Sequence, residues 1–134
     1  MPLARTQTGQ SKLGLLILLA VIGFFLLCAF RLIPAYTEDR YIQSALSSLG
    51  DEGALVNELS DNEIRRKISN FFMINNVRSQ TAKDLQIERL KDRVLVSLDY
   101  EVRVPLLYNI DVVMTFNNTW DSSRPDECCK PASE

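Results

Sequence analysis

One uninterrupted apolar run dominates the hydrophobic pattern of the chain. Residues 13–30, LGLLILLAVIGFFLLCAF, carry no charged side chain and lie between Lys12 and Arg31. A helix of this length covers about 27 Å, close to the hydrocarbon thickness of a bilayer. Because lipid offers no hydrogen-bond partner to the backbone, the run predicts a membrane-spanning helix. We extend the span to residues 13–33, since the Arg31 side chain is long enough to reach the interface.

Helical periodicity continues after the span. Pro34 predicts a kink, or a new helix that has Pro34 in its first turn. Apolar side chains then recur at i, i+1, i+4, i+5 and i+8 from Tyr41, which predicts an amphipathic helix over residues 35–49. Its outward positions include Glu38, Asp39, Gln43 and Ser47. Residues 50–53, GDEG, are expected to end it.

A capping box announces a second helix. Ser60 and Glu63 have the S-x-x-E spacing, and the apolar face that follows consists of Ile64, Ile68, Phe71 and Phe72. Residues 75–76, NN, are expected to close this helix. The basic triplet at 65–67 would suit a phosphate or a lipid headgroup, but a solvated helix face is the favoured interpretation.

Strand periodicity takes over after residue 84. A short strand over 85–90 and a polar turn at 91–93 precede a strict alternation from Val94 to Val104, which Pro105 is expected to end. A turn at 106–109 then leads to a third strand over 110–120. Short connections imply an antiparallel meander, and helices followed by strands predict an α+β fold with the helices on one face of the sheet.

These elements divide the chain into four parts. We expect a cytoplasmic tail (1–12), a transmembrane helix (13–33), a periplasmic α+β domain (34–120) and a flexible tail (121–134). All 17 acidic residues follow residue 35, whereas Arg5 and Lys12 precede the span, which favours a cytoplasmic N-terminus and an inner-membrane location. An uncleaved anchor is preferred to a signal peptide, because the run is long and no A-x-A-like cleavage site follows it.

Few residues suggest chemistry. The chain has no histidine, and Cys28 lies inside the span, where a packing role is expected. Adjacent Cys128 and Cys129 are a candidate disulfide, within the chain or to another chain; a soft metal and no structural role are the alternatives. Zinc would need about two more ligands than this segment offers.

The remaining patterns favour a protein that is not an enzyme and has no cofactor. Asp99 and Glu101 share one strand face with the spacing of a carboxylate pair, but such a row is ordinary on a solvated strand. The part of the chain after the span is acidic, which excludes nucleic acid as a partner, and no small-molecule substrate is indicated. Gly14, Ala20 and Gly23 are candidates for close helix–helix contact in the membrane.

Two stretches resemble a proteobacterial family of single-pass inner-membrane proteins, the domain-of-unknown-function family DUF4845. The first is TGQSKLG at 8–14 with RLIPAY at 31–36, and the second runs from Ile68 to YEVRVPL at 100–106 and NIDVV at 109–113. The resemblance brings no catalytic residue. Genes of the family commonly neighbour those of type I signal peptidase and ribonuclease III, which implies a role in the envelope or in secretion.

The layout also resembles that of a type IV pilin or pseudopilin. A pilin has a glutamate five residues after its processing glycine. If Gly9 is that glycine, this chain has Gly14 in place of the glutamate and departs from the pilin pattern. The first hypothesis is therefore an accessory subunit of an envelope membrane complex, with the bilayer and a membrane protein, signal peptidase as the candidate, as partners. The second is a pilin-like structural subunit.

Overall fold

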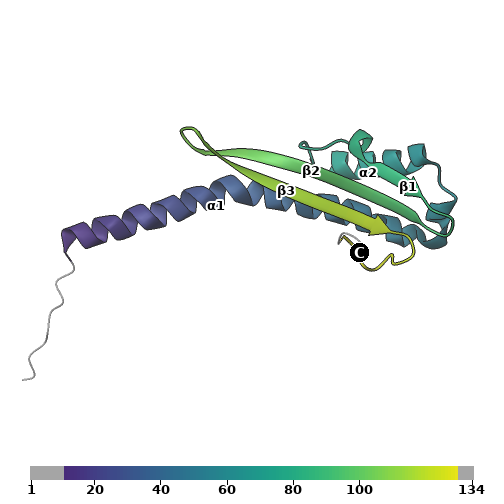
Figure 1. Ribbon diagram of the computed structural model, residues 1–134, viewed down its shortest axis with the longest axis horizontal. Coiled ribbons are helices and arrows are strands. Elements are labelled where there is room, and N and C mark those ends of the chain that lie inside the picture. The colour runs from purple at the N-terminus through teal and green to yellow at the C-terminus, as the bar shows by residue number, and fades with distance from the viewer. Residues whose placement is uncertain (1–10, 130–134) are drawn as a thin grey trace, which may run out of the picture.

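A single long helix carries the rest of the molecule (Figure 1). The computed structural model describes residues 11–129, and its first element, α1 (Lys12–Ser47), joins the expected span to the amphipathic segment. Ser11 caps the helix, because its side chain accepts a hydrogen bond from the Gly14 amide at 3.1 Å. None of the most apolar 18-residue window of this helix is buried. The N-terminal half of α1 is thus a candidate single-pass membrane span.

Pro34 lies inside α1 and does not restart it. Figure 1 shows that the helix changes direction between its apolar first half and the half that packs under the sheet, as expected where a proline removes a backbone hydrogen bond. The hydroxyl of Thr37 donates to the Ile33 carbonyl at 2.9 Å close to this point.

A 3-10 helix and a second α-helix follow α1. The 3-10 helix η1 (Ser48–Asn57) contains Gly53 at φ 56°, a left-handed conformation that favours glycine. Helix α2 (Asp61–Ile74) begins at the expected capping box, in which Ser60 and Glu63 satisfy each other's backbone amides. The hydrogen bonds from the amide and hydroxyl of Ser60 lower the pKa of Glu63. Asn75 caps the other end of α2, as predicted.

Three antiparallel strands form one sheet in the order β1-β2-β3. After the short 3-10 turn η2 (Ala82–Asp84), the strands are β1 (Gln86–Arg89), β2 (Val94–Leu107) and β3 (Ile110–Asp121). Only the start of β2, Val94–Ser97, pairs with β1, whereas β3 pairs with β2 along nearly its whole length. The predicted α+β class and meander are confirmed.

The expectation that Pro105 ends the second strand is wrong. β2 continues through Pro105, which is paired with Asp111, and reaches Leu107 after a bulge. Proline is tolerated because β1 pairs only with Val94–Ser97, so that the part of β2 that contains Pro105 has a neighbouring strand on one side only.

One hydrophobic core lies between the helices and one face of the sheet. Its fully buried members include Ile42 and Leu46 of α1, Ile68 of α2, and Leu98 and Trp120 of the sheet. Alternate residues of β2 point away from this core, as the strict alternation in the sequence predicts. The helices therefore cover one face of the sheet and leave the other exposed.

The segment after β3 does not form the flexible tail that was expected from residue 121. Residues 122–129 fold back onto the domain: Ser122 exchanges two hydrogen bonds with the backbone of Val94, and the Pro125 carbonyl accepts the indole N–H of Trp120 at 3.4 Å. A Cβ on Gly50 would approach the Pro125 carbonyl oxygen to 3.0 Å, so a glycine at this position permits the contact. The rest of the expected tail, 130–134, lies outside the described residues, as do residues 1–10.

Candidate functional site

A single row of exposed side chains follows α1 from the candidate span into the domain. Its members are spaced by three or four residues and so lie within about 100° of the helix circumference. They are Leu15, Leu19, Ile22, Leu26, Phe30, Ile33, Thr37 and Tyr41, all exposed, with Thr37 as the one polar member. We call this set the exposed apolar row.

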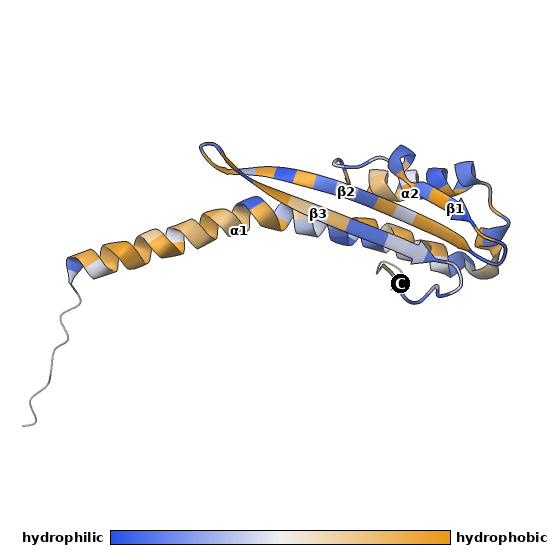
Figure 2. Cartoon of the chain, in the orientation of Figure 1, coloured by the Kyte–Doolittle hydropathy of each residue, from blue (hydrophilic) through white to orange (hydrophobic). Residues whose placement is uncertain are grey.

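The sheet covers the opposite side of α1. Ala35, Asp39, Ile42 and Leu46 are buried there, about 180° from the exposed apolar row. Because one face is already occupied by the domain's own core, the exposed apolar row remains uncovered along both halves of the helix. Figure 2 shows mainly hydrophobic colouring along the first half of α1 and a mixture of colours in the second half.

A shallow groove lies beside the exposed apolar row where the candidate span ends. It has a volume of about 440 Å³ and is lined by Leu32, Ile33, Tyr36, Thr37 and Arg40. The lining combines aliphatic and aromatic surface with one guanidinium group. Such a groove suits the side chains of a neighbouring helix better than it suits a polar small molecule.

The three small residues proposed for helix contact do not share one face. Ala20 and Gly23 are three positions apart and lie within about 60° of each other, whereas Gly14 is about 180° from Gly23. Gly14 instead takes part in the Ser11 cap. Only Gly23 borders the exposed apolar row, and a Cβ built there meets no atom within 4 Å.

Asp39 is the most unusual polar residue of the domain. The sequence pattern placed it outward, but the structure buries it at 6% exposure between α1 and the sheet. One carboxyl oxygen accepts from the Tyr100 hydroxyl at 2.9 Å and from the Asn118 amide at 2.7 Å, and the other accepts from Gln43 at 2.7 Å. This cluster ties α1 to both long strands and thereby fixes how the sheet sits on the helix.

Burial raises the pKa of Tyr100 well above its ordinary value, and the hydrogen bond to Asp39 raises it further. The phenol therefore stays protonated and acts as a donor at any physiological pH. Its ring also stacks on Phe116, which meets Tyr36 edge-on at 5.5 Å between ring centroids. Polar and aromatic contacts thus lie side by side along the same helix–sheet seam.

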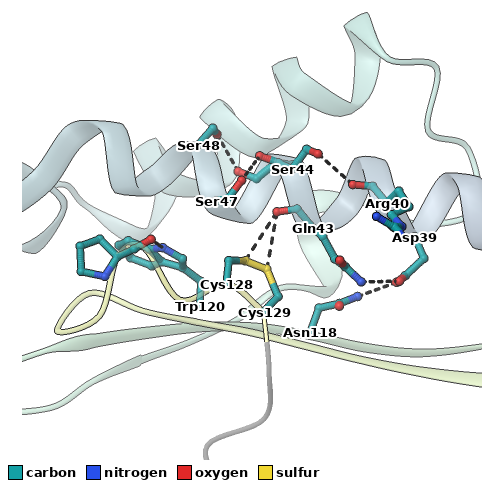
Figure 3. The surroundings of a disulfide bond; sticks show 12 residues. Asp39, Arg40, Gln43, Ser44, Ser47, Ser48, Asn118, Trp120, Cys128 and Cys129 are labelled. Carbon is teal, nitrogen blue, oxygen red and sulfur yellow. Dashed lines mark hydrogen bonds between the residues drawn. A yellow bond between two sulfur atoms is a disulfide. The ribbon is translucent and has the colours of Figure 1, made fainter.

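Cys128 and Cys129 come together as a vicinal disulfide against α1 (Figure 3). Their sulfur atoms lie 3.6 and 3.5 Å from the Gln43 carbonyl oxygen, and Cys129 forms an isolated antiparallel bridge with Thr119. The pair therefore secures the 122–129 segment against both the helix and β3.

Asp121 supports the same segment from its other end. Burial raises the pKa of Asp121, but the amide and hydroxyl of Ser123 donate to this carboxylate, and the guanidinium groups of Arg93 and Arg124 lie near it. The favourable contacts outweigh burial, and the pKa falls below its usual value. The carboxylate form is therefore the one that holds this turn together.

The other candidate residues have structural surroundings. Arg65 of the basic triplet donates to the carbonyls of Ala82 and Lys83, and Lys67 pairs with Glu52. On the outer sheet face, exposed Glu101 pairs with Arg103 at 3.0 Å. Within residues 11–129, no group of three or more His, Cys, Asp or Glu side chains is placed to hold a metal ion.

Three features define the class of protein. They are a candidate span, a domain built on the second half of the same helix, and the exposed apolar row common to both halves. It is a small α+β protein with one candidate membrane anchor. The model of the family described as domain of unknown function, DUF4845, matches residues 31–116, and the chain belongs to this family. Comparisons with curated proteins and with solved structures found no match.

Proposed function

We propose that this chain is a non-enzymatic, single-pass inner-membrane protein that acts as an interaction subunit of an envelope membrane complex. The supporting observation is the exposed apolar row, which continues from the candidate span past Pro34 to Tyr41. In lipid such a surface costs nothing to expose, but beyond the bilayer the exposed Tyr41 ring would face water. A partner helix that itself crosses the interface would cover both parts of the row.

The partner in this proposal is a membrane protein with a helix that extends beyond the bilayer. Type I signal peptidase is the named candidate, because genes of the family commonly neighbour its gene. The groove beside Ile33 and Tyr36 would receive side chains of that helix. Contact there buries aromatic and aliphatic surface, the composition that carries most binding energy in protein interfaces.

Site-specific photo-crosslinking tests the proposal. A benzophenone side chain replaces Ile33 or Tyr41 in the full chain, expressed in its native host. Met73 is the matched control, since it is also apolar and 73% exposed but lies on α2. The proposal expects one and the same membrane protein crosslinked from positions 33 and 41 and not from 73. A chain that yields no adduct from either row position contradicts it.

The orientation in this proposal follows from the charges near the span. Arg5 and Lys12 precede it and no acidic residue does, which favours retention of that end in the cytoplasm. Protease added to spheroplasts should then digest the domain that follows Pro34. Protection of the domain in intact spheroplasts, with digestion after lysis, would reverse the orientation.

A pilin-like structural subunit is the second candidate, favoured by one observation. The first half of α1 projects and the second half packs on an antiparallel meander, which is the pilin layout (Figure 1). Mass spectrometry of the protein isolated from membranes separates the two candidates. A mature chain that lacks residues 1–9 supports the pilin-like subunit, whereas an intact N-terminus supports the interaction subunit.

A further inference from the structure

The turn that joins β2 to β3 carries an exposed apolar surface of its own. Residues 104–110, VPLLYNI, contain no charged side chain, and we call them the hairpin tip. Tyr108 is fully exposed, and Leu107 and Ile110 are 43% and 57% exposed. Figure 2 shows hydrophobic colouring in both strands close to this turn.

The contacts between sheet and helix determine the direction in which the hairpin tip points. Phe116 of β3 contacts Tyr36 of α1. Asn118, two residues later in β3, contacts Asp39, which is three residues later in α1. From Phe116 towards Asn118, β3 therefore runs in the same direction as α1. The reverse path, from Phe116 to Tyr108, must lead back towards the first half of the helix, and Figure 1 shows the turn beside that half.

The hairpin is long enough to reach the level of the bilayer. Eight residues separate Phe116 from Tyr108, which corresponds to about 26 Å of strand, or about 18 Å along α1 if the strand is inclined by about 45°. The expected span ends at Ile33, only about 4.5 Å of helix before Tyr36. The hairpin tip therefore extends past the end of the span, and its side chains reach the level of the bilayer.

We propose that the hairpin tip inserts into the outer face of the same bilayer that holds α1, as a second membrane contact. This inference rests on the proposed function, because it needs the span to lie in a membrane. Lipid is the occupant because the tip lies beside the span at bilayer level, where lipid is the solvent. Leu107 and Ile110 would enter the acyl chains, and the Tyr108 ring suits the interface.

The backbone and charges of the hairpin are compatible with this position. β2 and β3 remain paired as far as Leu107 and Ile110, so the backbone groups between the two strands are satisfied up to the turn. The outer edges of this part of the hairpin have no third strand to pair with, so the tip must stay shallow enough for water and headgroups to reach them. The nearest charged side chains, Arg103 and Asp111, lie on the domain side of the hairpin tip, nearer to water than its apolar residues. Two contacts with one bilayer would fix the tilt of the domain relative to the membrane.

Quenching of tryptophan fluorescence by lipids with brominated acyl chains tests the insertion. The full chain is reconstituted in vesicles with and without bromine. The chain has one native tryptophan, Trp120, which is fully buried at the far end of β3 and provides a constant background. The test variant is Tyr108→Trp, and Ile110→Trp repeats the test if the first variant does not fold.

Two control variants separate the possible failures. Lys91→Trp places the probe in the exposed turn between β1 and β2, at the opposite end of the sheet. Phe25→Trp places it in the candidate span. We expect quenching of Tyr108→Trp by about two-fold, as for a side chain about 5–10 Å deep, and none of Lys91→Trp.

Each outcome then has one meaning. If Phe25→Trp is quenched and neither tip variant is, the insertion is wrong and the anchored protein stands. If Phe25→Trp is not quenched either, the anchoring itself fails. A blue-shifted Tyr108→Trp emission without quenching, lost when the protein is diluted in lipid, would show that a second copy covers the tip and would overturn the proposal.

Discussion

Removal of the Asp39 carboxyl group should destabilise the domain strongly. In Asp39→Ala, the Tyr100 hydroxyl and the Asn118 amide lose their shared acceptor while they stay buried, at 8% and 2% exposure. Gln43 is half-buried and can turn towards water. A buried donor left without a partner costs about 1–3 kcal/mol, so two such donors give a loss of at least about 2 kcal/mol.

Thermal unfolding of the full chain in detergent measures this loss. Trp120 is the one tryptophan and is fully buried, so its fluorescence reports the unfolding of the core. For a domain of this size, about 2 kcal/mol corresponds to a fall in Tm of at least about 8 °C. The control Asp99→Ala removes an exposed carboxylate from the outer face of β2 and should leave Tm nearly unchanged.

A double variant makes the reasoning refutable. Adding Tyr100→Phe to Asp39→Ala removes one of the stranded donors, so the double variant should be more stable than the sum of the two single losses implies, by about 1 kcal/mol. A fall in Tm for Asp39→Ala no larger than that for Asp99→Ala, or strict additivity in the cycle, would show that the buried cluster does not secure the sheet to α1.

Three further outcomes can be measured. The folded-state pKa of Asp121 is lowered, so its contribution to stability is complete above the unfolded pKa of about 4 and is lost as the pH falls through the folded value. The stability difference between the wild type and Asp121→Asn should therefore narrow on acidification, and a constant difference would contradict this. The pKa of Tyr100 is raised, so the difference between wild type and Tyr100→Phe should hold below pH of about 10 and shrink above it. With Cys128 and Cys129 oxidised, alkylation of the unfolded protein without reductant should label Cys28 alone, whereas labelling of all three cysteines would exclude the disulfide.

The sequence determined the local elements and the faces that their periodicity specifies. The apolar run at 13–30 and the Ser60–Glu63 capping box satisfy their backbone groups within a few residues, and the alternation from Val94 to Val104 repeats every two residues. Such features are complete in a short window of sequence, so a pattern is enough to recognise them. The family followed from the same local runs of residues.

The tertiary structure decided which surfaces are covered. Asp39 sits on a helix whose polar positions alternate with apolar ones, and only the long-range partners Tyr100 and Asn118 turn it inward. Pro105 stays in its strand because β1 ends earlier, a fact of sheet pairing that no local pattern contains. The 122–129 segment likewise folds back because Trp120 and α1 offer it partners.

The candidate interaction surfaces have the same double origin. The residues of the exposed apolar row follow helical spacing in the sequence. Because every face of α1 is apolar within the span, however, the sequence alone does not distinguish this row from the others. The row is distinguished when the sheet covers the opposite side of α1. The position of the hairpin tip at bilayer level follows in turn from the contacts of Tyr36 and Asp39, because the direction of a strand along a helix is set by packing across the whole domain.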